Sequence, residues 1–339
     1  MKISDTRPLG RTGLSPTIAS YGGGSLGNFG RVISNAAARD VLDAAWDAGI
    51  RYFDTAPFYG RGKSERRIGA YLEEKPRADF ILSSKVGRLL DPAPGGAEED
   101  GIFLDPSPFD PRWDYSYDGV MRSFELSLHR LGLDRIDILF VHDIGVRLHG
   151  EDFPAQLKTL REGGIRALEE LRRSGAIGGY GLGVTEAEVC LDCLDYADPA
   201  AFLLAASYTL LDQAGTRPLL DRCLARGVSL VIGGVFSSGI LATGPVPDAR
   251  YDYAPASGDV LERVRRLEAI CARHGVPLSA AALQFPLAHP AVATVLLGAG
   301  MVRSLQQCAA GFACAIPRAL WDELCHEGFI DTLDDLDFG

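Results

Sequence analysis

The sequence has no stretch of eighteen consecutive apolar residues, the length that a membrane-spanning helix requires. The first ten residues, Met1 to Gly10, are polar and lack the apolar core of a secretory signal. No run of lysine and arginine is long enough to form a basic patch, and the formal net charge of −11 repels phosphate backbones. These absences argue against a membrane protein or a nucleic-acid binder, and they predict a cytoplasmic location.

Cysteine is sparse and irregularly spaced. The seven residues are an odd number without a framework spacing, which predicts reduced thiols rather than a set of disulfides. Cys190 and Cys193 form one CxxC pair. A zinc site would need a second pair or nearby histidines, and the segment from Glu186 to Asp195 offers neither. We therefore expect buried helix residues here and no metal site.

The chain also lacks a Pro/Ser-rich linker, so residues 1–339 are predicted to form one α/β domain. With 47% hydrophobic and 23% charged residues, the chain has enough apolar side chains for a large core. Short apolar or β-branched runs predict eight strands. These are Thr17 to Tyr21, Arg51 to Thr55, Phe80 to Ser84, Ile136 to Val141, Gly179 to Val184, Phe202 to Ala206, Ser229 to Ile232 and Ala293 to Leu297.

Amphipathic stretches between these runs predict helices, several of which end at a glycine. They are Ala36 to Ala48, Ser64 to Glu73, Val120 to Leu131, Gln156 to Arg173, Glu188 to Tyr196, Pro218 to Arg226 and Gly258 to His274. Repeated βα units predict a TIM barrel. Two long segments do not fit the repeated βα pattern. Val86 to Asp118 is predicted to be a functional loop because it is rich in aromatic residues, and Thr243 to Ser257 a mobile flap.

A G-x-G-x-x-G match at Gly22, Gly24 and Gly27 resembles a dinucleotide-binding fingerprint. In that fingerprint the third glycine opens a helix directly, whereas here Asn28 to Val32 lies before the first capping residue. We therefore place the glycines in the first βα loop of the barrel, where they allow a ligand to approach the backbone.

Three predicted strands end in titratable residues. Asp54 ends the strand before the loop that carries Tyr59, Lys85 ends the next, and His142 ends the following one. Taken singly, these residues have ordinary structural explanations: a cap, a packing aromatic, a surface lysine and a core histidine. Barrel enzymes, however, gather their chemistry at the C-terminal ends of the strands. The joint placement therefore favours one active site.

The pattern D-T-A-P-x-Y-G-x-x-x-S-E, completed by Ser64 and Glu65, resembles the aldo-keto reductase superfamily, as do the strand-end Lys85 and His142. The resemblance covers nearly the whole chain and implies an N-terminal hairpin that closes the barrel floor. It implies that Tyr59 is the general acid/base, that Asp54 holds Lys85 charged, and that His142 orients the substrate oxygen. A tyrosine of ordinary pKa, about 10, needs the nearby lysine to serve this role.

Two segments resemble the branch of D-threo-aldose (L-fucose) 1-dehydrogenases and pyridoxal 4-dehydrogenases: Arg112 to Gly119, and Tyr208 to Gln213. The branch implies oxidation of a cyclic hemiacetal, such as L-fucose or D-arabinose, to a lactone. Pyridoxal oxidation and general aldehyde or ketone reduction remain alternatives, as does a non-catalytic, cofactor-sensing barrel. Arg88, Trp113 and Asp143 are the candidate substrate contacts, and Phe103 and Phe109 are further stacking candidates.

The cofactor segments depart from the family pattern. Gly233 stands where the resemblance implies a nicotinamide-stacking tyrosine, and Ala205 where it implies a glutamine. Gly298 and Ser304 replace two cations that would neutralise an NADP 2′-phosphate, which favours NAD, with NADP possible through the neighbouring Arg303. The cofactor-binding residues implied by the resemblance are Gly24, Thr185, Tyr208, Gly234, Val235, Phe236, Ser237, Gly239, Leu241, Gly298, Ala299, Arg303 and Gln307. The sequence carries no signature of an oligomeric state.

Overall fold

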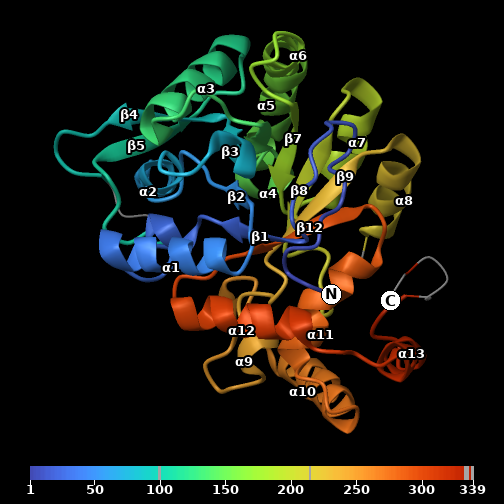
Figure 1. Ribbon diagram of the computed structural model, residues 1–339. Coiled ribbons are helices and arrows are strands. Elements are labelled where there is room, and N and C mark those ends of the chain that lie inside the picture. Colours follow the sequence, from blue (N-terminus) through green and yellow to red (C-terminus); the bar gives the residue numbers. More distant parts are fainter. Residues whose placement is uncertain (98–100, 214, 332–335, 337–339) are drawn as a thin grey trace.

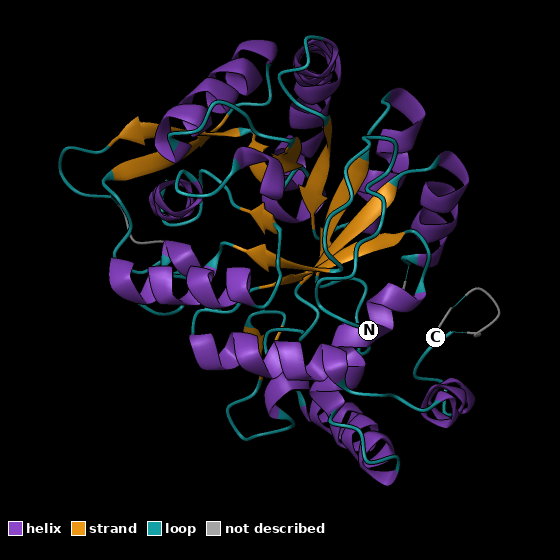
Figure 2. Cartoon of the chain, viewed as in Figure 1, coloured by secondary structure: helices purple, strands orange, loops and turns teal. Residues whose placement is uncertain are grey.

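The computed structural model describes residues 1–97, 101–213, 215–331 and 336. Eight strands, each parallel to both neighbours, close into a barrel, and helices surround it (Figures 1 and 2). The strands are β1 (Ala19–Gly22), β2 (Tyr52–Asp54), β3 (Ile81–Val86), β6 (Ile138–His142), β7 (Gly179–Val184), β8 (Ala201–Ala205), β9 (Ser229–Gly233) and β12 (Val292–Leu297). The predicted eight strands and TIM barrel are confirmed.

Most predicted helices are present, with ends that agree or differ by at most three residues. They are α1 (Asn35–Asp47), α2 (Lys63–Leu72), α3 (Tyr117–Leu131), α7 (Ala187–Tyr196), α8 (Arg217–Arg226) and α10 (Gly258–Arg273). The structure adds the short helices α4 (Val146–His149) and α9 (Ile240–Thr243), and α11 (Leu278–Gln284), α12 (Val302–Ala313) and α13 (Arg318–His326). The sequence does not predict α11 because it is short, alanine-rich and almost wholly buried, whereas α12 and α13 were missed although each has one buried and one exposed face. Cys190 and Cys193 are buried in α7, as expected.

The helix predicted from Gln156 to Arg173 is divided. It consists of α5 (Phe153–Thr159), a π-helical turn at Leu160–Gly164 and α6 (Ile165–Arg173). The wide turn contains two glycines that face the chain just before α3. A Cβ at Gly164 would lie 2.5 Å from the carbonyl oxygen of Tyr115. The paired glycines therefore let the helix approach this backbone more closely than side chains would allow.

The prediction that Val86 to Asp118 is a loop was wrong in part. The segment contains an antiparallel ribbon of β4 (Arg88–Pro92) and β5 (Phe109–Trp113), which extends at the left of Figure 1. Prolines at both strands disfavour a strand prediction, but a two-stranded ribbon has free edges that tolerate them. The second interruption likewise contains a small hairpin, β10 (Arg250–Tyr251) and β11 (Ala254–Pro255).

The N-terminal hairpin implied by the resemblance is present. The Leu9 amide donates to the Leu14 carbonyl oxygen at 2.9 Å, and Thr6 pairs with Thr17 in antiparallel fashion. Leu9 is fully buried and belongs to the apolar cluster inside the barrel. The Gly10 amide donates to the hydroxyl of Ser229, at the first residue of β9, at 2.7 Å. The hairpin therefore closes the end of the barrel where the strands begin.

Side-chain alternation along the strands positions the candidate site. Tyr52 and Phe140 belong to the apolar cluster inside the barrel. Residues two positions apart on a strand point to the same face. Asp54, two residues after Tyr52, and His142, two residues after Phe140, therefore point inward at the opposite end of the barrel from the N-terminal hairpin. Asp54 and His142 therefore lie in the layer of inward-facing side chains at the C-terminal ends of the strands.

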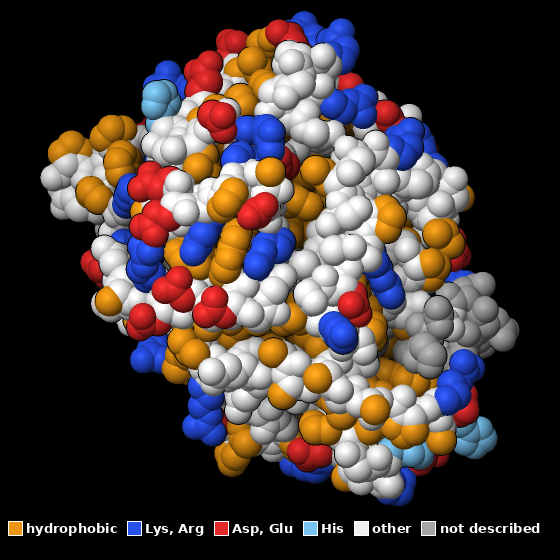
Figure 3. Space-filling model, viewed as in Figure 1, with side chains coloured by type: hydrophobic (Ala, Val, Ile, Leu, Met, Phe, Trp, Pro, Cys, Tyr) orange, Lys and Arg blue, Asp and Glu red, His pale blue; other side chains and the backbone are white. Residues whose placement is uncertain are grey.

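No helix among the described residues is long and apolar enough to cross a membrane. On the face shown in Figure 3, acidic and basic side chains are interspersed and do not gather into a patch of one sign.

The barrel wall depends on close backbone contact at Gly181 in β7. A Cβ there would lie 1.7 Å from the carbonyl oxygen of Ala201 in β8. We expect Gly181→Ala to lower the free energy of unfolding by about 3 kcal/mol, because neither backbone can move without disturbing the sheet. The matched control is Gly22→Ala in β1, where the nearest atom is 3.7 Å away. Chemical denaturation measures both, and equal stabilities would contradict the argument.

Candidate active site

The ends of β2 and β3 hold a buried ion pair. Lys85 Nζ lies 2.6 Å from Asp54 Oδ2 and also donates to the carbonyl oxygen of Thr55 at 3.0 Å. Lys85 and Asp54 are each only 1% exposed. Burial favours the neutral amine, but the negative charges of Asp54 and ionised Tyr59 together with their hydrogen bonds outweigh it, so the pKa of Lys85 lies above its usual value. The barrel therefore holds a fixed cation at its C-terminal end.

The second carboxylate oxygen of Asp54 has a partner that sequence reasoning missed. Ser83 Oγ donates to Asp54 Oδ1 at 2.6 Å, and Tyr52 OH donates to Ser83 Oγ at 3.0 Å. All three side chains are buried inside the barrel. Ser83 precedes Lys85 by two positions, so the alternation of strand residues could have indicated that it faces the same side. The hydroxyls of Tyr52 and Ser83 therefore hold the Asp54 carboxylate in place, and the carboxylate in turn holds Lys85.

The loop carrying Tyr59 is held by the other residues of the D-T-A-P-x-Y-G-x-x-x-S-E pattern. Ser64 Oγ donates to the carbonyl oxygen of Gly23 at 2.7 Å, and the buried Glu65 accepts a bond from Ser84 Oγ at 2.7 Å. A Cβ at Gly27 would lie 2.5 Å from the carbonyl carbon of Tyr59. The glycine loop was predicted to let a ligand approach its backbone. At Gly27 the segment that approaches is the loop carrying Tyr59.

Tyr59 meets both Lys85 and His142. Lys85 Nζ lies 4.8 Å from the centre of the Tyr59 ring, and the rings of Tyr59 and His142 are 5.7 Å apart at 81°. The ring of Phe103 lies 5.8 Å from Tyr59 on the ribbon side. Burial raises the pKa of Tyr59 to about 12, with Lys85 acting in the opposite direction. The four residues predicted as catalytic are thus brought together.

His142 is a neutral imidazole. Burial, with the positive charges of Arg88 and Lys85, holds its pKa well below the usual value. Its Nε2 lies 3.5 Å from Asp143 Oδ2, and its Nδ1 is buried with no hydrogen-bond partner in the described structure. A neutral imidazole beside Tyr59 can exchange a hydrogen bond with a substrate oxygen without adding charge.

The three predicted substrate residues also converge. Arg88 forms an ion pair with Asp143, and its guanidinium carbon lies 3.8 Å from the ring centre of Phe58 and 3.9 Å from that of Trp113. Trp113 is opposite Arg88 in the ribbon register, whereas Phe109 pairs with Pro92 at the other end. Four residues of strand span about 13 Å, so Phe109 stands farther from Tyr59 than the other stacking candidates do.

Tyr115 and His149 were not predicted, although they support this wall. Tyr115 OH donates to the carbonyl oxygen of His142 at 2.8 Å and lies 2.9 Å from His149 Nε2. The Trp113 ring stacks on Tyr115, with centroids 5.6 Å apart. A Cβ at Gly87 would strike the Tyr115 ring at 2.4 Å. Only the tertiary packing of the ribbon against the loop after β6 reveals these contacts.

The candidate cofactor residues lie on loops after five strands. The loops of β1 and β12 are joined because the Ala299 carbonyl oxygen accepts bonds from Tyr21 OH at 2.8 Å and Ser25 Oγ at 3.0 Å. A Cβ at Gly24 or Gly298 would meet no atom within 4 Å, so both face open space. The loops after β7 and β8 are also joined, because the Ser207 hydroxyl donates to the carbonyl oxygen of Thr185.

Tyr208, 4% exposed, packs at 5.2 Å against Phe285 and has little surface left for a ligand. Gly233, at the end of β9, pairs with Ala205 at the end of β8. Both lie at the barrel mouth, and no aromatic ring occupies either position.

The loop after β9 offers fewer free amides than its sequence suggests. The amides of Ser237, Gly239 and Leu241 donate to carbonyl oxygens within the loop, as does that of Ile240. Among the described residues, no acceptor is found for the amides of Val235, Phe236 and Ser238. Gly234, with φ of 65°, turns the chain where a Cβ would crowd Ala206. A concave turn with free amides suits an anion such as a pyrophosphate.

On α12, Arg303 and Gln307 are exposed and Ser304 is half-buried. Within the described part of the chain no carboxylate pairs with Arg303. The residues present therefore fit a nucleotide at this end of the barrel, with Arg303 exposed on α12 and Arg31 in contact with Met301 at its start.

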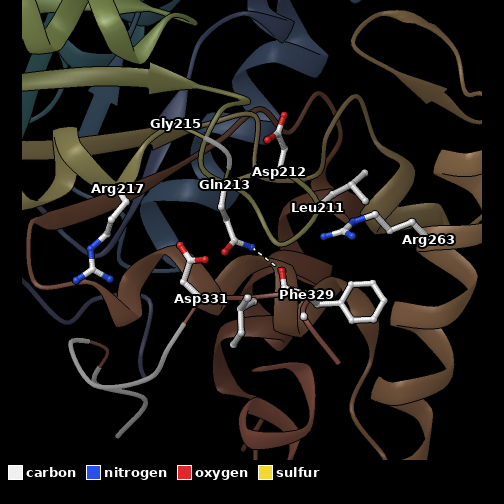
Figure 4. Close-up of a pocket in the computed structure, with 10 residues that line it drawn as sticks. Leu211, Asp212, Gln213, Gly215, Arg217, Arg263, Phe329 and Asp331 are labelled. Carbon is white, nitrogen blue, oxygen red and sulfur yellow. Dashed lines mark hydrogen bonds between the residues drawn. The ribbon is translucent and has the colours of Figure 1, made fainter. Parts of the chain in front are cut away.

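A separate hollow of about 400 Å³ lies between the loop after β8 and the C-terminal segment (Figure 4). Gln213 Nε2 crosses it and donates to the carbonyl oxygen of Phe329 at 3.0 Å. None of the predicted site residues lines it. In the described ranges, no group of histidine, cysteine and carboxylate residues could hold a metal ion.

Comparison with known proteins explains the arrangement. The model of the aldo/keto reductase family matches residues 20–324. The chain belongs to the aldo/keto reductase family. It is accordingly an NAD(P)-dependent oxidoreductase, and the recognition made from the Asp54–Tyr59 pattern is confirmed.

Two curated relatives of this aldo/keto reductase extend over nearly its whole length. It is 44% identical to the pyridoxal 4-dehydrogenase of Microbacterium luteolum, covering 97% of this chain and 99% of that protein. It is 39% identical to the D-threo-aldose 1-dehydrogenase of a Pseudomonas species, covering 97% and 100%. An aldo-keto reductase structure from Bacillus halodurans superposes with a TM-score of 0.73 at 25% identity, covering 95% and 96%.

The charge state of His142 can be observed directly. Because its pKa is far below the usual value, we expect the imidazole of this aldo/keto reductase to stay neutral between about pH 8 and pH 5.5. Nitrogen NMR of ¹⁵N-histidine-labelled protein checks this, with His142→Asn used to assign the signal. Titration with a midpoint near the ordinary histidine value, about 6.5, would contradict the assignment of a neutral imidazole.

Proposed function

We propose that this aldo/keto reductase oxidises a cyclic hemiacetal at its anomeric carbon, C1 in an aldose such as L-fucose or D-arabinose, to a lactone with NAD(P). The observation that carries the proposal is the position of Tyr59, between the Lys85 cation and the neutral imidazole of His142. The similarity to a pyridoxal 4-dehydrogenase and a D-threo-aldose 1-dehydrogenase supports the substrate class. Pyridoxal and an aldose both close an aldehyde onto a hydroxyl of the same molecule.

In the oxidation, the Tyr59 oxygen accepts the proton of the substrate hydroxyl while the C–H bond breaks on the same carbon. Lys85 stabilises the phenolate form that can accept this proton, because an adjacent positive charge lowers a tyrosine pKa. Asp54 keeps Lys85 protonated and in place. His142 orients the substrate oxygen by a hydrogen bond to its imidazole. The reverse steps reduce a carbonyl group.

When bound, the nicotinamide nucleotide supplies the hydride acceptor and, in its oxidised form, a positive ring charge. The residues proposed to hold it lie on the loops after five strands and on α12. They are Gly24, Thr185, Tyr208, the turn from Gly234 to Leu241, Gly298 and Ala299, and on α12 Arg303 and Gln307. The free amides of Val235, Phe236 and Ser238 suit the pyrophosphate. Tyr208 is buried and packs against Phe285, so its part is to shape the wall.

Pyridoxal 4-dehydrogenation and general carbonyl reduction are the competing activities. A screen of NAD reduction against aldoses and pyridoxal, together with NADH oxidation against simple aldehydes, separates them. We expect oxidation of at least one hemiacetal to exceed every reduction in kcat/KM. Fast reduction of open-chain aldehydes with no oxidation of any hemiacetal would overturn the proposal.

Removing the phenolic oxygen tests the role of Tyr59. We expect Tyr59→Phe to lower kcat by a factor of about 10³ or more, because proton transfer in the transition state is lost. Cofactor affinity, measured by fluorescence titration, should change little because the ring remains. Lys63→Met, four residues after Tyr59, breaks a surface pair with Asp105 and controls for packing of this segment. Turnover within tenfold of wild type would remove Tyr59 from the mechanism.

The cofactor preference follows from the residues on α12 and the loop before it. Gly298 and Ser304 carry no charge, so a 2′-phosphate loses two cations and keeps Arg303, with Arg31 also near by at 2.8 Å from Met301 Sδ. We expect kcat/KM to be higher with NAD than with NADP, measured at saturating sugar. A tenfold advantage for NADP would refute this, and loss of that advantage in Arg303→Ala would identify the cation responsible.

A further inference from the structure

Arg88 is held in a fixed position beside the tetrad. Its guanidinium lies between the faces of Phe58 and Trp113, and its side chain is only 9% exposed. Stacking on two rings restrains both the position and the plane of the group. Its Nε is buried with no hydrogen-bond partner in the described structure.

Asp143 is fixed as firmly, and by a different constraint. It adopts a left-handed backbone conformation, φ 54°, and its amide donates to the Gly183 carbonyl oxygen at 2.9 Å. Few residues other than glycine, asparagine and aspartate tolerate this conformation. Its Oδ2 pairs with Arg88 and lies 3.5 Å from His142 Nε2, while the side chain keeps 22% of its surface exposed. An acceptor therefore faces the site beside the donor.

The charges of the protein side chains at the site cancel one another. Lys85 is paired with Asp54, Arg88 is paired with Asp143, and His142 is neutral. No cation among these groups remains available to compensate an anionic substrate. A carboxylate or phosphate near the Arg88 pair would instead meet the negative charge of Asp143, and juxtaposed like charges in a partly desolvated site are costly.

We propose that the Arg88–Asp143 pair restricts the enzyme to uncharged, hydroxyl-bearing hemiacetals and excludes those bearing a carboxylate or phosphate. Arg88 donates to one ring hydroxyl and Asp143 accepts from its neighbour, beside the oxygen that His142 orients. The inference rests on the proposed function, since it takes the reacting hemiacetal to lie beside Tyr59. To the proposed function, the inference adds that the substrate is uncharged and that Arg88 and Asp143 select it.

The test compares L-galactose with L-galacturonate, which differ only in that a CH₂OH group is replaced by a carboxylate. With wild-type enzyme and NAD, we expect kcat/KM for the acid to be lower by about 100-fold. Equal or faster oxidation of the acid would overturn the inference while leaving the proposed function standing. Failure to oxidise any neutral hemiacetal would overturn the proposed function, and the inference with it.

A variant assigns the discrimination to Asp143. Asp143→Asn keeps the shape and tolerates the left-handed backbone. We expect it to raise the ratio of acid to neutral kcat/KM by about tenfold, because the like charge is removed. The matched control is Asp91→Asn, which breaks an exposed aspartate–arginine pair on the same ribbon, with Arg112. A ratio unchanged in Asp143→Asn, or raised equally in both variants, would contradict the assignment.

Discussion

The buried pair of Lys85 and Asp54 is the constraint on which the site depends. Removing two charges from water costs several kcal/mol per ion, and only close pairing with further hydrogen bonds compensates this. The barrel supplies those bonds from Ser83 and from the carbonyl oxygen of Thr55, and Tyr52 supports Ser83 from the layer below. The cation can stay buried because every partner stands on a neighbouring strand or its end.

The fold explains why the tetrad forms at this end of the barrel. The N-terminal hairpin and the apolar layer around Tyr52 and Phe140 fill the interior, leaving the polar layer of Asp54, Lys85 and His142 above them. Tyr59 stands on a loop that cannot shift easily, since Gly27, Ser64 and Glu65 tie it to the first loop and to β3. The surrounding wall of Arg88, Trp113 and Tyr115 is built by the ribbon that follows Lys85.

The sequence predicts the parts of this arrangement that repeat or carry a pattern. Eight strands are predicted because each is a short apolar run, and the tetrad because Asp54, Lys85 and His142 fall at strand ends and Tyr59 in the loop after one of them. Ser83 and Tyr115 were missed, since their roles depend on which atoms of other elements they face. The ribbon was missed because Pro92 and Pro111 argue against strands, although a two-stranded ribbon outside the barrel tolerates proline at its free edges. The π-helical turn was missed because the role of Gly163 and Gly164 is to allow close contact with the backbone before α3. The sequence does not show that contact.

The central claim is that Lys85, held in place by Asp54, offsets part of the rise that burial causes in the pKa of Tyr59 and so lets Tyr59 accept a proton. Lys85 lowers that pKa more than Asp54 raises it, so removing both charges should raise it. The most direct measurement is the pH dependence of the single-turnover oxidation rate in wild type and in the double variant Lys85→Met with Asp54→Asn. We predict that the inflection moves to higher pH in the double variant. An unmoved inflection, or one at lower pH, would contradict the account.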